Sequence, residues 1–166
     1  MFLRSTLVLC SATLAACDQP ATDTPSSAVE ASDPVAADIQ TSQPTVLDRK
    51  PSPEGATVYV VSPTGGEALE NPVRVVFGLK GAGVAPAGID LPDTGHHHLL
   101  VDADLPPLNL PIPADDRHIH FGGGQTETVL TLSPGTHTLQ LLLGDFLHIP
   151  HDPPLMSERV TIEVQQ

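Results

Sequence analysis

The chain of 166 residues has little cysteine, few aromatic residues and little positive charge. Its two cysteines, Cys10 and Cys17, lie in the first 17 residues, so the remainder has no pair from which to build a disulfide. One Tyr, four Phe and no Trp argue against an aromatic platform for bases or sugars. Seven basic residues against 20 acidic ones give a formal charge of −13, which excludes the basic face that nucleic-acid binding requires.

The first 17 residues are typical of a bacterial lipoprotein signal peptide. Arg4 supplies the positive charge and a short apolar segment follows, too short for a membrane span. Leu14-Ala15-Ala16-Cys17 resembles a lipobox, which predicts cleavage before Cys17 and lipidation of that cysteine. A plain secretory signal is the alternative. Asp18 resembles the signal that keeps lipoproteins on the inner membrane, with the outer membrane as the other location.

Residues 18–54 are rich in Ala, Thr, Ser, Pro and Asp and show no apolar periodicity. Such a segment buries too little apolar surface to offset the entropy of ordering, so we expect a disordered acidic tether. A flexible chain of this length spans roughly 30–37 Å. The tether would therefore hold a folded domain, residues 55–166, on the periplasmic side of the envelope, with the membrane contacted through the N-terminal lipid.

Short β-branched runs separated by Pro, Gly and Asp clusters begin at residue 56, a pattern typical of an all-β domain. Apolar and polar residues alternate in 139–143 and 160–164. The size and strand number predict an immunoglobulin-like antiparallel β-sandwich, with a small jelly roll as the alternative. The expected strands are 57–61, 73–79, 97–102, 128–132, 137–143 and 159–164, and the Pro- and Gly-rich stretches 80–96 and 103–121 are expected to be ordered loops.

All eight histidines lie in the predicted domain, where they outnumber its four basic residues two to one. Because alternate side chains of a strand share a face, His96 and His98 can converge on one metal ion, and so can His118 and His120. A third pair, His148 and His151, flanks a proline in a predicted loop. The candidate metal ligands are His96, His98, His118, His120, His148 and His151. His97 points the opposite way, shares its face with Leu99 and Val101, and is expected to be packed in the core.

Imidazole suits Cu²⁺ and Zn²⁺ among the common metal ions. No cysteine follows Cys17 and Met156 is the one methionine after Met1, which argues against thiolate and methionine-rich sites. We therefore expect a binding domain for Cu or Zn rather than an enzyme, because no serine has the context of a nucleophile. A metal-dependent envelope hydrolase is one alternative. The other is an envelope interaction module whose histidines are structural. The sequence identifies no protein partner.

Short motifs rich in His, Gly and Pro recur through the predicted domain. They are Phe77–Gly81, Gly83–Gly88, Gly95–Leu100, Asp104–Pro107, His118–Gly122, Gly124–Glu127, Pro134–Leu141, Gly144-Asp145 and His148–Pro154. Together they resemble the uncharacterised bacterial family called domain of unknown function 4399, over essentially all of residues 56–166. The resemblance implies a small secreted or lipid-anchored β domain that contains all three histidine groups, and it implies no known activity.

Overall fold

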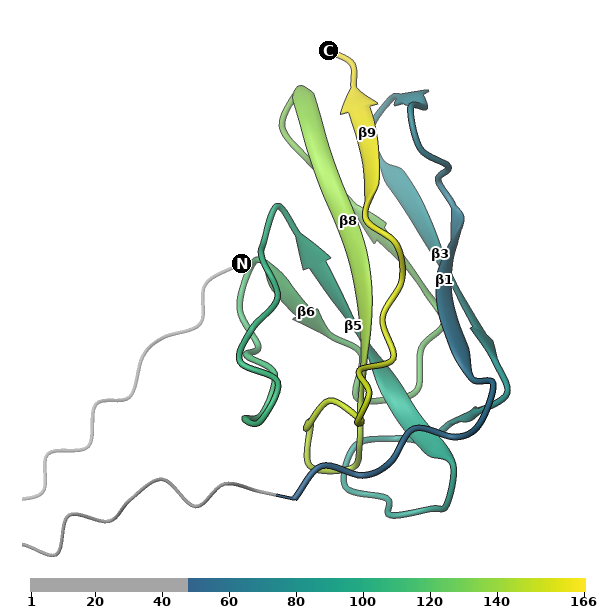
Figure 1. Ribbon diagram of the computed structural model, residues 1–166. Helices are drawn as coiled ribbons and strands as arrows, with labels where there is room; N and C mark the ends of the chain where they lie inside the picture. Colours follow the sequence, from purple (N-terminus) through teal and green to yellow (C-terminus); the bar gives the residue numbers. More distant parts are fainter. Residues whose placement is uncertain (1–47) are drawn as a thin grey trace, which may run out of the picture. The chain divides into compact units, whose positions relative to one another are not determined.

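The structure is a computed structural model that describes residues 48–166 (Figure 1). The predicted signal peptide with Cys17, and residues 18–47 of the predicted tether, lie outside the described residues. The described part is all β, as predicted, and consists of two sheets without a helix. Accordingly, none of its elements is a helix that could cross a membrane.

The smaller sheet has three antiparallel strands in the order β1-β3-β7. They are β1 (Thr57–Ser62), β3 (Val73–Lys80) and β7 (Glu127–Leu130). Alternation decides which face is buried: Val73, Val75 and Phe77 of β3 point into the core, whereas Arg74 points to solvent. This sheet therefore contributes one apolar face to the interior.

The larger sheet has six strands in the order β2-β9-β8-β5-β4, with β6 also paired to β5. The pairs β5/β8, β8/β9 and β5/β6 are antiparallel, whereas β2/β9 and β4/β5 are parallel. The strands are β2 (Ala68–Leu69), β4 (Gly83–Val84), β5 (Thr94–Val101), β6 (His118–His120), β8 (Gly135–Gly144) and β9 (Val160–Val164).

The main core lies between the two sheets. It joins residues of β1 and β3 to residues of β5, β8 and β9, which form one continuous apolar cluster. Its members from the large sheet include Leu99, Leu139, Leu141 and Ile162, each at most 1% exposed. Burial of this apolar area is the dominant favourable contribution to folding.

Strand β5 is buried on both faces, which is unusual for a strand of an antiparallel sheet. Every residue from Gly95 to Val101 is buried. One face contributes Leu99 and Val101 to the main core, while Leu100 on the other face belongs to a second apolar cluster with Ala103, Ile112 and Leu142. The chain after β5 and the chain after β8 therefore cover the outer face of the large sheet.

The predicted strands all exist, and their ends differ by at most three residues from those expected. The assignment of 80–96 and 103–121 entirely to loops is wrong. The first stretch contains β4 and the beginning of β5, including His96, and the second contains β6. β4 and β6 are two and three residues long and are defined by their pairing with β5, which local patterns do not reveal.

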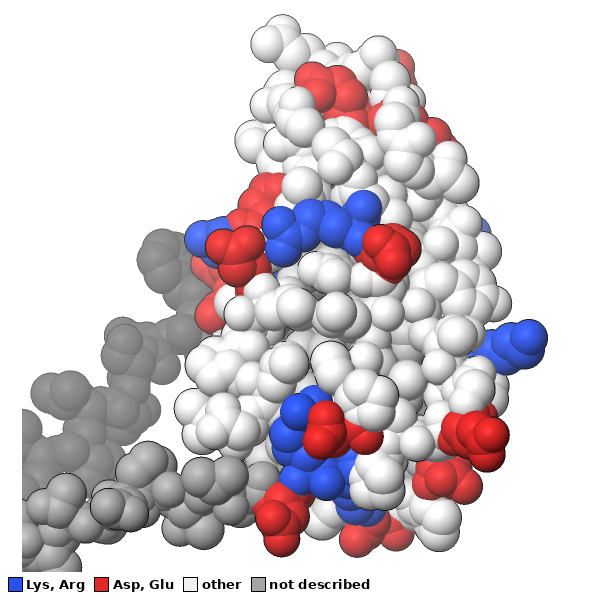
Figure 2. Space-filling view, viewed as in Figure 1, with Lys and Arg blue, Asp and Glu red and all other residues white. Residues whose placement is uncertain are grey.

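Residues at the start of the described chain lie against the domain. Arg49 donates from Nε to the Pro150 carbonyl at 3.0 Å and pairs with Asp152 at 3.1 Å. Lys50 pairs with Asp90 and lies 4.6 Å from the ring centroid of Phe146. In the view of Figure 2 most basic side chains lie beside acidic ones. Such exposed ion pairs each contribute little to stability.

Candidate metal centre

Strand β5 places two of the candidate ligands on the outer face of the large sheet. His96 and His98 point outward with Leu100, whereas His97 points into the core, where its ring centroid lies 5.2 Å from that of Phe77. The predicted packing of His97 is thereby confirmed. The outward imidazoles lie under the chain that covers this face, and both residues are 0% exposed.

Strand β6 brings a third imidazole to the same place. His120 pairs with His98 in the antiparallel register, and residues directly opposite each other lie on the same face. The ring centroids of His96, His98 and His120 are 4.9–5.0 Å apart. One nitrogen from each ring lies within 4.8 Å of the others, a group able to hold a metal ion. With metal–nitrogen bonds of about 2.0–2.1 Å, a tetrahedral ion needs roughly 3.4 Å between ligand nitrogens, so the rings would move closer together on binding.

A fourth imidazole contacts these three rings. The ring centroid of His148 lies 4.7 Å from that of His120, 4.9 Å from that of His96 and 5.9 Å from that of His98. His148 belongs to the turn after β8 rather than to a strand, and its φ is +68°. We refer to His96, His98, His120 and His148 as the imidazole cluster.

Five ring nitrogens of the cluster are buried without a protein partner. Both ring nitrogens of His96 and of His98, and Nε2 of His120, are buried without a hydrogen bond. A buried polar atom without a partner costs about 1–3 kcal/mol, so native proteins rarely leave several in one place. Each neutral imidazole carries one lone pair that a metal ion would satisfy. The residues present therefore fit an imidazole-bound transition metal.

Burial and mutual repulsion lower the pKa of three cluster residues, His96, His98 and His120, and so keep their rings uncharged near neutral pH. Burial, followed by repulsion from His96, His120 and His148, lowers the pKa of His98 to about 2. Burial, followed by repulsion from His148, His120 and His97, lowers the pKa of His96 to about 4. The pKa of His120 is also lowered, by burial and then by His148. The lone pairs are therefore free for an ion without prior loss of a proton.

Two glycines make room for the rings. A Cβ on Gly122 would lie 2.3 Å from Cε1 and 2.6 Å from Nε2 of His120, and a Cβ on Gly144 would lie 2.9 Å from Cε1 of His98. Any side chain at either position would have to displace a ring. The sequence places Gly122 at the end of the motif His118–Gly122 but gives no signal of this role.

The structure does not bring His118 and His151 into the cluster. Among the described residues, no ring contact joins either of them to the four rings. His118 lies opposite Leu100, and its Nδ1 is 2.9 Å from a carboxylate oxygen of Asp115. His151 is 2% exposed, and burial lowers its pKa. Of the six candidate ligands, four are therefore brought together and two are not.

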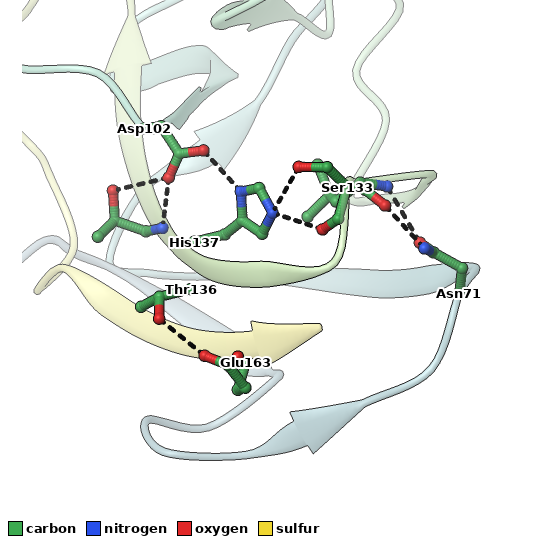
Figure 3. A network of polar contacts seen from close by, with 8 residues as sticks. Asn71, Asp102, Ser133, Thr136, His137 and Glu163 are labelled. Carbon is green, nitrogen blue, oxygen red and sulfur yellow. Dashed lines mark hydrogen bonds and ion pairs between the residues drawn. The ribbon is translucent and has the colours of Figure 1, made fainter. Parts of the chain in front are cut away.

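His137 forms a separate network that resembles a catalytic triad in composition only (Figure 3). Its Nδ1 lies 2.6 Å from Oδ2 of Asp102, and its Nε2 lies 2.8 Å from the Ser133 carbonyl oxygen and 3.4 Å from the Ser133 hydroxyl. Burial lowers the pKa of His137, but the hydrogen bonds to Asp102 and Ser133 outweigh it and raise the pKa overall. Because both nitrogens donate to acceptors, the ring does not serve as a base for Ser133.

Fold and site together define a two-sheet β domain whose outer face holds an imidazole cluster able to bind a metal ion. The chain belongs to the family described as Domain of unknown function (DUF4399), which matches residues 75–165 and so includes the whole cluster. The match confirms the resemblance seen in the sequence. Comparisons with curated proteins and with solved structures gave no match.

Proposed function

We propose that the domain binds one transition metal ion, Cu²⁺ or Zn²⁺, through His96, His98 and His120, with His148 as the fourth ligand. The observation that carries the proposal is the convergence of nitrogens within 4.8 Å of one another, buried and without protein partners. A histidine with a structural role normally has its own hydrogen-bond partners, as His137 does. Five ring nitrogens of His96, His98 and His120 have none, a property that they share with the core residue His97. What favours a metal over the alternative of structural histidines is that the nitrogens of His96, His98 and His120 also converge on one point.

The donor set favours these ions over others. Mg²⁺ and Ca²⁺ prefer oxygen ligands, and the cluster offers neutral nitrogen only. Four imidazoles suit Zn²⁺ in tetrahedral geometry and Cu²⁺ in a more planar one. Leu100, Ile112 and Leu142 form an apolar cluster on the same face of the sheet as the histidines. An apolar surrounding limits the access of water to a bound ion.

Binding rather than turnover is the function that the geometry supports. A cavity of about 370 Å³ lies between β1 and residues 154–160, with Tyr59, Leu155 and Met156 among its lining residues, and no cluster histidine lines it. A metal hydrolase needs a substrate pocket beside an ion with an open coordination position. Four imidazoles in mutual contact would instead occupy all four coordination positions of a tetrahedral ion.

We also propose that the domain is an immunoglobulin-like sandwich, with a jelly roll as the alternative, held on the periplasmic side of the envelope by a lipid on Cys17. The two facing sheets support the first part. The sequence Leu14-Ala15-Ala16-Cys17 supports the second, and Asp18 favours the inner membrane over the outer one.

Replacing Cys17 with Ser is expected to move the protein from the membrane fraction to the soluble periplasmic fraction. A serine offers no thiol for the lipid, and the described residues contain no helix that would replace the anchor. Fractionation followed by immunoblotting measures the distribution. Cys10→Ser, inside the same predicted signal peptide, should stay in the membrane fraction. A Cys17→Ser protein that remains there would refute the lipid anchor.

Metal binding is tested by calorimetric titration of the purified protein with Cu²⁺ and with Zn²⁺ at pH 7. We expect one ion per chain and at least about tenfold weaker binding by Gly122→Ala, because the new Cβ pushes the His120 ring out of position. Gly123→Ala is the matched control, since a Cβ there meets only the flexible amide end of Gln125. Wild-type protein that binds neither ion, or Gly122→Ala that binds as tightly as wild type, would contradict the proposal.

A further inference from the structure

The four imidazoles of the cluster are not held equivalently. His96 and His98 belong to β5, which pairs with β8 on one side and with β6 on the other. His120 belongs to β6 and lies opposite His98. These three are fixed by ladder hydrogen bonds on adjacent strands. His148 alone comes from a turn. It is partly exposed, as His120 is, whereas His96 and His98 are completely buried.

The backbone of that turn is held firmly by Asp145, which is 2% exposed. Its Oδ1 accepts hydrogen bonds from the N–H groups of Leu147 at 2.8 Å and Ile149 at 2.9 Å. The N–H of His148 donates to the Asp145 carbonyl at 2.9 Å, and the N–H of Ile112 donates to the His148 carbonyl at 2.9 Å. The backbone of His148 is therefore fixed, and its ring can leave the cluster only by rotation of the side chain.

The conformation of His148 carries strain that the other three ligands lack. Its φ of +68° lies in the left-handed region, which a residue with a side chain adopts at an energetic cost. Strain of this kind is concentrated at functional sites, where the surrounding structure enforces it. Here the contacts of Asp145 enforce it, and the result is that the ring points at His96 and His120.

We propose that His148 is the exchangeable ligand of the metal, and that its rotation opens a fourth coordination position to an external neutral nitrogen donor of the imidazole class. The inference rests on the proposed metal binding. In the exchange, the bond between the ion and the His148 nitrogen breaks and a bond to the incoming imidazole nitrogen forms. Both ligands are neutral, so the charge of the ion does not change. The three strand-borne imidazoles retain the ion during this step.

An external donor fits because of where His148 lies. It is the partly exposed cluster residue on the turn, and the residue before it in the chain, Leu147, is 47% exposed. Removal of the His148 side chain would leave a space of imidazole size against the rings of His96 and His120. The same chemistry would let a histidine of another molecule take the ion over.

The test uses His148→Gly in the purified, Cu²⁺-loaded or Zn²⁺-loaded protein. Glycine suits a φ of +68°, so the variant keeps the turn without its strain. Dissociation of the ion into an excess of chelator is followed by absorbance. We expect His148→Gly to release the ion at least about tenfold faster than wild type, and millimolar imidazole to slow the release toward the wild-type rate.

Leu147→Ala is the matched control, because it shortens the neighbouring exposed side chain of the same turn, and it should release the ion at the wild-type rate. Circular dichroism of the metal-free variants checks that both are folded. Suppose that wild type binds metal but His148→Gly releases it at the wild-type rate, or that imidazole does not slow the release from His148→Gly. Either result would overturn the proposed exchange without contradicting the metal site. Wild type that takes up no ion would overturn the proposed function itself.

Discussion

Replacing His98 with Leu is expected to abolish metal binding and, at the same time, to stabilise the metal-free protein. His98 is 0% exposed, both of its ring nitrogens are buried without partners, and burial lowers its pKa to about 2. The metal-free protein therefore bears the desolvation of a polar ring with no compensating bond. Leucine removes the ligand and the unsatisfied nitrogens together.

The size of the stabilisation follows from those nitrogens. Leaving a buried polar group unsatisfied costs about 1–3 kcal/mol, and a leucine of similar volume would join Leu100, Ile112 and Leu142 on the same face. We therefore expect about 1–3 kcal/mol greater stability without metal, or roughly 4 °C in Tm for each kcal/mol in a domain of this size. Buried histidines that destabilise the metal-free protein are expected where the residues are retained for binding rather than for stability.

Thermal unfolding in chelator and calorimetric titration with Cu²⁺ measure the two effects. His97→Leu is the matched control, since it replaces the adjacent buried histidine of the same strand on the opposite face, against Phe77. That variant should bind metal as wild type does. The interpretation of the site fails if His98→Leu still binds the ion with wild-type affinity, or if His97→Leu loses it.

Local patterns predicted much of the fold because they record which face of a strand is buried. The alternation in Leu139, Leu141 and Leu143 corresponds to the core face of β8, and that in Ile162 and Val164 to the core face of β9. The same rule predicted that His96 and His98 would share a face and that His97 would be packed inside. Each of these inferences needs only the period of a strand.

The composition of the cluster could not be predicted, because it depends on pairings between distant segments. The spacing of His118 and His120 gives no reason to prefer one of them as a ligand. The register of β6 against β5 decides, because it places His120 opposite His98 and His118 opposite Leu100. A three-residue strand carries no local signal that sets this register. Likewise, the choice of His148 over His151 depends on the bonds of Asp145 within the turn.

Acidification is expected to unfold the metal-free protein well before most carboxylates are protonated. Burial lowers the pKa of His96 and of His97 to about 4 and that of His98 to about 2, whereas each is near 6.5 in an unfolded chain. Below pH 6.5 the unfolded chain therefore binds more protons than the folded one. Stability that is present above pH 6.5 is lost as the pH falls toward the folded values.

The expected loss is large because several groups act in the same direction. Each contributes up to about 1.4 kcal/mol per pH unit, and less near pH 6.5, where the unfolded imidazole is half protonated. Three groups therefore remove roughly 5 kcal/mol between pH 6.5 and pH 5. This is comparable with the whole stability of an ordinary domain. His120 and His151 also have lowered pKa values and add to the loss. His137 acts in the opposite sense: its pKa is raised, so its contribution is complete below pH 6.5 and is lost as the pH rises through the folded value.

Urea unfolding in chelator at pH 7, 6 and 5 measures the slope of the unfolding free energy with pH. His97→Leu and His98→Leu each remove one group with a lowered pKa, so each should reduce the mean slope from pH 7 to pH 5 by about 1 kcal/mol per pH unit. The double variant should reduce it by twice as much, because each group exchanges its own proton on unfolding. An unfolding free energy that stays constant or rises from pH 7 to pH 5 would show that the buried imidazoles do not remain neutral in the folded protein. Retention of the full slope in both variants would assign the acid sensitivity to other groups.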